Sequence, residues 1–223
     1  MAYAPVGALN QVRRWGNLVS GVAWSTIKVP LAIASVRQAQ GRPDATVRQL
    51  MRLAITWSDN NAALGLWDRL GAPATAAART EAVLRDGGDE LTTVPAYQKR
   101  PPYTPFGQSD WSLTSQARFA AALPCLRGSG PVLALMGQII PDQSWGIGAV
   151  RGTIAFKGGW GPGADGRYLV RQLALVRLPN GARIGLALAS IAHDGTFASG
   201  IADLTSLGRW AVQHIHTNAH SGC

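Results

Sequence analysis

Apolar residues recur three and four positions apart through residues 25–140, which is the spacing of helices with one buried face. This pattern predicts helices over residues 25–40, 45–57, 62–71, 73–85, 112–122 and 131–140. Residues 89–110 interrupt the pattern with four prolines and are expected to form a long ordered loop, a kind of segment that often carries function.

The pattern changes to strand alternation after residue 150. Strands are predicted over residues 153–157, 168–178 and 183–191, with turns at 158–163 and 180–181 and a terminal helix over 196–215. Near the N-terminus, residues 2–6 and 12–15 predict a weak β-hairpin. The expected fold is therefore α+β, with a five-stranded antiparallel sheet built from both chain ends and an inserted all-helical subdomain. Residues 1–24 and 150–223 would form the sheet subdomain with its terminal helix, and residues 25–149 the helical subdomain.

The composition supports a packed core and excludes a disordered chain, because 47% of the 223 residues are hydrophobic and only 15% are charged. No run of eighteen apolar residues is present, so we expect no membrane span. The net charge is +9, but the basic residues are scattered and lack interleaved aromatic residues, which argues against nucleic acid as a partner.

Lysine is rare in this chain. Eighteen of the 21 basic residues are arginine, and the three lysines are Lys28, Lys99 and Lys157. Arginine keeps its proton in proteins whereas lysine can lose it, so lysine is the residue expected where an amine serves as a base.

Ser25-Thr26-Ile27-Lys28 opens an apolar run that continues to Ala34. On a helix, positions i and i+3 share a face, so the Ser25 hydroxyl and the Lys28 amine are expected within hydrogen-bond reach. Burial of that helix would lower the pKa of Lys28, and a neutral amine is a competent general base for a serine. The alternative interpretation is structural: a serine N-cap and a lysine whose amine reaches the surface.

Two further segments carry candidate chemistry. Ser58-Asp59-Asn60 lies between two predicted helices, and Lys157-Gly158-Gly159 ends a predicted strand. Structural alternatives exist for both: a helix cap at residues 58–60, and a surface lysine followed by a hairpin turn at residues 157–159.

Taken in order, these three segments resemble the active-site set of penicillin-binding proteins and class A β-lactamases, which is S-x-x-K, then S-D-N, then K-T-G. The resemblance covers nearly the whole chain, and the sheet–helices–sheet order is similar to the fold of that superfamily. It departs at the start, where the helix that usually precedes the first strand has no counterpart in this sequence.

The resemblance implies five catalytic residues. Ser25 would be the nucleophile that forms an acyl-enzyme, and Lys28 would take or relay its proton. Ser58 would pass a proton to the leaving group. Asn60 would hold Lys28 and bind the amide of the substrate side chain. Lys157 would bind Ser58 and supply positive potential for a substrate carboxylate.

The resemblance also implies substrate-binding positions at Gly158, Gly159, Trp160 and Arg167. The backbone N–H groups of Ser25 and Trp160 would form the oxyanion hole. Arg167 begins the next predicted strand, ten residues after Lys157, and is a candidate second anchor for a carboxylate; a solvated surface arginine is the alternative.

Two departures from the family pattern bear on activity. Gly158 replaces the Thr or Ser whose hydroxyl would bind a substrate carboxylate, which would cost about 1.5–3 kcal/mol of binding. Residues 92–110 contain no glutamate, and their only acid is Asp110, so the usual loop base of an E-x-x-L-N motif is missing. Glu81 and Glu90 lie near this segment without the motif. Deacylation is therefore expected to be slow.

The prediction is an acyl-serine hydrolase in which a β-lactam, a D-alanyl peptide or a small ester acylates Ser25, with no metal and no organic cofactor. The alternative is a catalytically silent binding or structural protein that keeps the fold. The expected partners are small-molecule or peptide acyl donors, peptidoglycan among them, and the expected state is a monomer.

The resemblance implies an extracytoplasmic location, but the N-terminus lacks a charged-then-apolar signal pattern, which leaves a cytoplasmic location open. The C-terminal tail carries His214, His216, His220 and Cys223. Metal binding and a frayed terminus are the two interpretations of that tail.

Overall fold

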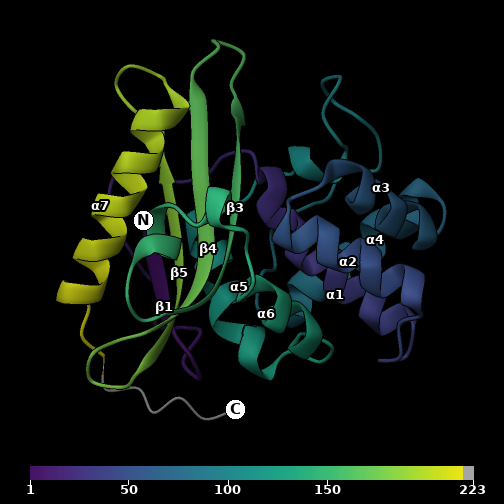
Figure 1. Cartoon of the computed structure of the whole chain (residues 1–223), viewed down its shortest axis with the longest axis horizontal. Coiled ribbons are helices and arrows are strands. Elements are labelled where there is room, and N and C mark those ends of the chain that lie inside the picture. Colours follow the sequence, from purple (N-terminus) through teal and green to yellow (C-terminus); the bar gives the residue numbers. More distant parts are fainter. Residues whose placement is uncertain (218–223) are drawn as a thin grey trace.

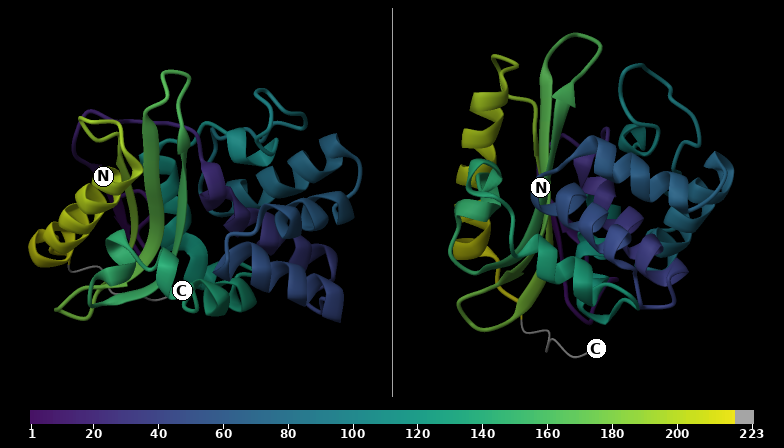
Figure 2. Two further views of the ribbon diagram at one scale, coloured as in Figure 1. Left: turned by 45° about the horizontal axis from the view of Figure 1, so that its top comes forward. Right: turned by 45° about the vertical axis from the view of Figure 1, so that its right-hand side comes forward.

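A computed structural model describes residues 1–217 of the chain. An antiparallel five-stranded sheet lies between the long helix α7 on one face and the helical part of the chain on the other (Figures 1 and 2). The strand order is β2-β1-β5-β4-β3, so segments from both ends of the chain build the sheet together. The strands are β1 (Ala2–Pro5), β2 (Arg13–Arg14), β3 (Thr153–Pro162), β4 (Tyr168–Arg177) and β5 (Arg183–Ser190).

The helices confirm the expected mixed fold. They are α1 (Lys28–Gln38), α2 (Ala45–Thr56), α3 (Asn60–Arg69), α4 (Pro73–Asp86), α5 (Leu113–Ala122), α6 (Gly130–Met136) and α7 (Phe197–His214). Short 3-10 turns are η1 (Trp24–Ile27), η2 (Phe106–Gln108), η3 (Leu123–Cys125), η4 (Pro141–Gln143) and η5 (Gly146–Ala149).

Four of these helices begin where a capping side chain stands in the sequence. Asp44, Asp59, Ser112 and Thr196 each accept a hydrogen bond from the backbone N–H three positions later. Such caps satisfy a donor that the helix itself leaves unpaired, typically with about 1 kcal/mol of stabilisation. The helix starts are therefore encoded locally.

Strand β3 is longer than predicted, and this corrects the turn expected at residues 158–163. Pairing with β4 continues through Gly158, Gly159 and Gly161 to Pro162, which pairs with Tyr168. The turn follows instead, where the Gly163 N–H donates to the Arg167 carbonyl at 2.8 Å. A glycine- and proline-rich segment is typical of turns, but here β3 is an edge strand, which tolerates proline.

The inner face of the sheet is covered closely by helix α5. A Cβ added at Gly185 of β5 would lie 2.0 Å from the backbone nitrogen of Ala121 in α5, so only glycine allows this approach. Helix α5 comes from the predicted helical subdomain yet packs on β1 and β5. Helix α6 ends at Met136, earlier than the predicted residue 140, because Gly137 follows as its C-cap.

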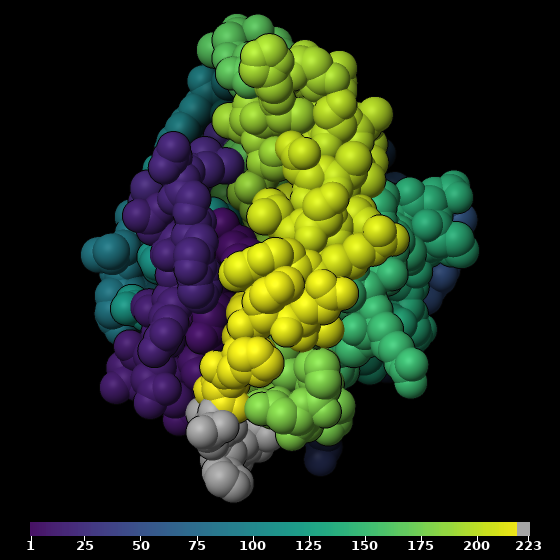
Figure 3. Space-filling model, turned by 90° about the vertical axis from the view of Figure 1, so that its left-hand side faces the viewer, coloured from purple at the N-terminus to yellow at the C-terminus, as the bar shows by residue number. Residues whose placement is uncertain are grey.

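The outer face of the sheet is covered by α7, which lies beside the N-terminal segment (Figure 3). Its buried residues, such as Leu204 and Ala211, join an apolar cluster with β4 and β5. Within residues 1–217, no single helix has the length and hydropathy to cross a membrane; one pair, Leu113–Cys125 with Gly130–Met136, reaches them only together and across a bend of 115°.

Candidate active site

Ser25 lies in the 3-10 turn η1, one turn before helix α1 begins. Trp24, just before it, has a φ of 49°, a left-handed conformation that costs a bulky side chain about 1–3 kcal/mol and clusters at functional sites. Strand β3 passes directly alongside, because a Cβ added at Gly159 would lie 2.8 Å from the Ser25 nitrogen. The glycine is therefore required by the contact between β3 and the Ser25 backbone.

Lys28 is the first residue of α1 and only 1% of it is exposed. Its amine donates to the Ser58 carbonyl at 2.5 Å and to the Asn60 Oδ1 at 2.7 Å. The expected direct hydrogen bond with Ser25 is not present among the described residues. The two residues do line the same pocket.

Ser58 connects the second and third sequence segments. It has a φ of 58°, so this loop, like Trp24, holds a non-glycine residue in the left-handed region. Its hydroxyl accepts a hydrogen bond of 2.9 Å from the Lys157 amine, which also donates to the Gly158 carbonyl. Lys157 is fully buried in β3, which rules out the surface-lysine alternative. Asp59 does cap α3, so the capping interpretation is confirmed for that residue.

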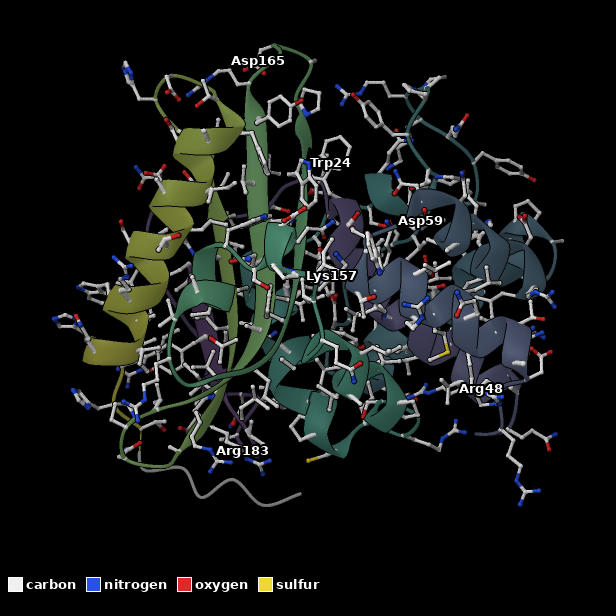
Figure 4. All side chains as sticks on the ribbon, in the orientation of Figure 1. Trp24, Arg48, Asp59, Lys157, Asp165 and Arg183 are labelled. Carbon is white, nitrogen blue, oxygen red and sulfur yellow. The ribbon has the colours of Figure 1, made fainter. Side chains whose placement is uncertain are left out.

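Burial dominates the electrostatics of both lysines. It lowers the pKa of Lys28 to about 7, and the nearby Asp59 carboxylate acts in the opposite direction. The pKa of Lys157 is held well below its usual value, by burial and then by repulsion from Lys28. Figure 4 shows Lys157 between the sheet and the helices, with Asp59 on the helical side. An amine with a pKa near 7 is half neutral at neutral pH, which suits a general base.

A pocket of about 400 Å³ opens beside these groups. Its walls come from η1, α1, α3, the loop between α4 and α5, and the end of β3: Trp24, Ser25, Lys28, Asn60, Asn61, Leu64, Pro102, Tyr103, Thr104, Gly107 and Trp160. No aspartate or glutamate is among these lining residues. A larger cavity of about 520 Å³, between α7 and the N-terminal segment, contains none of the predicted site residues.

The indole ring of Trp145 packs against Gly158. A Cβ at this position would lie 3.0 and 3.1 Å from carbons of the Trp145 ring. Trp145 packs edge-on against Trp160, with ring centroids 5.7 Å apart, and both contact Phe197. A side chain at position 158 would therefore be tight against the ring of Trp145, which would have to give by a few tenths of an ångström.

Arg167 lies apart from the groups just described. Its guanidinium donates to the Ala192 carbonyl at 2.8 Å, and its backbone N–H donates to Asp165 in the β3–β4 turn. Within residues 1–217, no hydrogen bond links it to Ser25 or Lys157. The surface-arginine alternative describes this placement.

The acidic residues near the long loop are engaged elsewhere. Glu81 accepts from the Val94 N–H at 2.6 Å and so ties α4 to the loop. Asp110 accepts from the Ser20 hydroxyl at 2.6 Å. Glu90 is exposed, and none of the three lines the pocket. The pocket therefore offers a lysine amine, hydroxyls and amides to an attacking water.

Two arginines near Ser25 escaped the sequence analysis. Arg100, from the long loop, donates to the Pro162 carbonyl at the end of β3. Arg171 of β4 is fully buried and donates to the Gly21, Val22 and Trp111 carbonyls. The unusual length of the loop was a sequence signal that could have pointed to Arg100. The only signal for Arg171 was its charge, at a position of an apolar strand where a hydrophobic core residue is expected.

Among residues 1–217, no three His, Cys, Asp or Glu side chains gather closely enough to hold an ion. In the tail, His214 stacks on Trp210 with ring centroids 4.8 Å apart. His220 and Cys223 lie outside the described residues.

Solved structures with a similar fold include β-lactamases and a penicillin-binding protein. A class A β-lactamase from Bacteroides cellulosilyticus superposes with a TM-score of 0.75 at 14% identity, covering 95% of this chain and 89% of its own. A β-lactamase from Burkholderia vietnamiensis gives 0.72 at 21% identity, covering 95% and 88%. A point mutant of PBP-A, in an acyl-enzyme complex with penicillin G, gives 0.69 at 20% identity, covering 95% and 88%.

No protein-family profile and no curated protein matches the sequence itself. The chain has the fold of the serine β-lactamase and penicillin-binding protein superfamily. The likeness at these identities establishes the architecture.

Proposed function

We propose that this protein is an acyl-serine hydrolase in which Ser25 attacks a β-lactam, a D-alanyl peptide or a small ester. The observation that carries the proposal is the chain of contacts around Ser58: Lys28 binds its carbonyl and Lys157 binds its hydroxyl. Three segments far apart in sequence thereby meet next to Ser25. If residues 58–60 were only a helix cap and Lys28 only a core lysine, these contacts between the three segments would not be required.

The first half-reaction is acylation. Neutral Lys28 takes the proton of the Ser25 hydroxyl as its oxygen bonds to the substrate carbonyl carbon. The Ser25 and Trp160 backbone N–H groups stabilise the oxyanion, each donor contributing roughly 3 kcal/mol. Ser58 then gives its proton to the leaving nitrogen or oxygen as that bond breaks, and Lys28 returns its own proton to Ser58. Asn60 holds Lys28 during these transfers.

The second half-reaction is hydrolysis of the acyl-enzyme. Water must lose a proton as it attacks the ester carbon, and the pocket residues include no carboxylate to take it. Lys28 or Ser58 has to serve instead. The expected kinetics are a burst of acylation followed by a low steady rate.

The test is intact-mass spectrometry after incubation with penicillin G, a cephalosporin and an activated aryl ester. The native chain should gain the mass of the acyl group, and Ser25→Ala should not. Thr26→Ser serves as a matched control, since it keeps a hydroxyl beside Ser25 and should still be acylated. Absence of any adduct with all three reagents would overturn the proposal.

The second candidate is a catalytically silent protein that uses the pocket for binding. The observations that favour it are the glycine at position 158 and the lack of a carboxylate in the pocket. Turnover of a chromogenic ester at equal rates by the native chain and Ser25→Ala would support this candidate.

The acyl-enzyme proposal also includes an extracytoplasmic location for the protein, where peptidoglycan is the available D-alanyl substrate.

A further inference from the structure

Arg100 is a cation fixed against the wall of the candidate pocket. Its guanidinium carbon lies 4.7 Å from the centroid of the Tyr103 ring and 5.9 Å from that of Trp24, two residues that line the pocket. One guanidinium nitrogen donates to the Pro162 carbonyl of β3. The side chain is half-buried, and these three contacts hold it between the loop and the strand.

The charge of Arg100 has no partner within the described part of the chain. The ion pair found in residues 1–217 joins Arg37 to Asp86, on another part of the molecule. The remaining guanidinium nitrogens of Arg100 make no hydrogen bond among these residues and are not sealed from solvent. A half-buried cation with unused donors beside an acid-free pocket attracts an anionic ligand group.

Strand β3 sets the distances between this cation and the chemistry. Gly159 abuts the Ser25 backbone, Lys157 lies two residues before it, and Pro162, which holds Arg100, lies three residues after it. At about 3.3 Å per residue, Lys157 and Pro162 lie roughly 7 and 10 Å from Gly159, in opposite directions along one strand.

The placement of Ser58 orients a substrate along this strand. Ser58 binds Lys157 and, under the proposed function, protonates the leaving group. The leaving group therefore lies toward Lys157 and the acyl group toward Arg100. We propose that Arg100 binds a carboxylate on the acyl portion of the substrate, so that the preferred acyl donors carry an acidic group on each side of the reacting carbonyl. This inference rests on the proposed function.

The test compares two esters that share a 3-carboxy-4-nitrophenol leaving group. One carries a glutaryl group with a free terminal carboxylate, and the other carries a pentanoyl group of similar length without it. The native chain should be acylated by the glutaryl ester with a kcat/KM about 10- to 100-fold higher, the effect of one charge-assisted hydrogen bond. The preference should shrink as salt rises, because the contact is partly exposed.

Arg100→Met keeps a long unbranched side chain at this position and removes the charge, so it should erase the preference while the pentanoyl rate stays within about twofold. Arg100→Lys should retain part of the preference. Arg48→Met is the matched control: Arg48 also donates to a proline carbonyl, that of Pro43, but lies far from Lys157 and Trp24 (Figure 4). Thermal unfolding of each variant confirms that it folds.

The outcomes separate the two proposals. Equal rates with both esters in the native chain, or a preference that survives in Arg100→Met, would overturn the role of Arg100 and leave Ser25 acylation standing. A lack of acylation by either ester, with the native chain indistinguishable from Ser25→Ala, would overturn the proposed function itself.

Discussion

The Lys157 amine donates a 2.9 Å hydrogen bond to the hydroxyl of Ser58, a residue 99 positions earlier in the chain. This contact joins the middle of β3 to the loop before α3, and it spans the interface between the sheet and the helices. It fixes a proton-carrying hydroxyl beside the pocket that contains Ser25. The contact therefore links a lysine of the sheet to a serine of the helical layer.

The contact predicts a functional asymmetry between two serines. Ser58→Ala should slow acylation by about 10²–10⁴-fold, the usual effect of losing a proton-transfer group. It also removes an acceptor of the buried Lys157 amine, at about 1–3 kcal/mol of unfolding free energy. Ser112→Ala removes the cap of α5 instead, so it should cost about 1 kcal/mol of unfolding free energy and leave acylation unchanged. Acylation rates from mass spectrometry and urea unfolding curves measure the two effects. Equal acylation rates in the two variants would contradict the role of Ser58.

The lowered pKa of Lys28, about 7, predicts the pH dependence of acylation. The neutral amine is the active form, so the rate should rise with pH, about tenfold per unit well below pH 7, and level off above it. Stopped-flow acylation of the native chain across this range gives the apparent pKa. Lys28→Arg keeps a positive charge that does not leave, and it should be inactive at every pH tested. A pH-independent native rate would exclude Lys28 as the base.

Features that depend on residues close together in the sequence were predictable, both in the fold and in the candidate site. Caps such as Asp44 and Ser112 mark the start of a helix in the sequence, because each side chain binds a backbone N–H only three residues later. The spacing of Ser25 and Lys28 predicted that they lie near one another. The Lys28 amine instead donates to the Asn60 side chain and to the carbonyl of Ser58, a residue with a left-handed φ.

Contacts between distant segments account for what the sequence analysis missed. Gly159 lies against the Ser25 backbone and Gly158 against the ring of Trp145, neighbours that only the folded sheet brings to them. A segment of glycines without that information predicts a turn. Likewise, Arg167 was a candidate because of its position ten residues after Lys157, but its guanidinium binds the Ala192 carbonyl. Tertiary packing brings Arg100 instead against Tyr103 and Trp24, two residues that line the pocket.

The packing of Trp145 on Gly158 predicts the effect of restoring the family threonine. Gly158→Thr would press its Cβ against the indole at 3.0 Å and add two further atoms, so it should destabilise the fold by about 1–3 kcal/mol. Trp145→Ala should relieve the clash, making the double variant more stable than the sum of the two single effects. A double-mutant cycle by urea unfolding measures this coupling. Additive effects would show that the ring moves aside freely.

The buried arginine Arg171 supports the turn that carries Ser25 through a chain of hydrogen bonds. Its guanidinium donates to the Gln116 side chain at 2.9 Å, Gln116 donates to the Thr26 hydroxyl at 3.0 Å, and Thr26 donates to the Ala23 carbonyl at 2.6 Å. The same guanidinium satisfies carbonyls of the segment that leads into η1. Ser25 therefore sits on a turn that is held from behind by a charged group in β4.

This arrangement predicts that Arg171 positions Ser25 and stabilises the fold at once. Arg171→Met leaves several buried acceptors without a donor, at about 1–3 kcal/mol for each, and should lower the unfolding free energy by several kcal/mol. Gln116→Leu is the milder probe, because it breaks the link to Thr26 and leaves the contacts of Arg171 to backbone carbonyls in place. It should reduce the rate of acylation at saturating ester while KM changes little, because a misplaced hydroxyl slows the chemical step more than binding. Arg177→Met, at the exposed end of the same strand, is the control and should match the native chain in rate. A Gln116→Leu variant that loses stability but acylates at the native rate would show that the network serves folding alone.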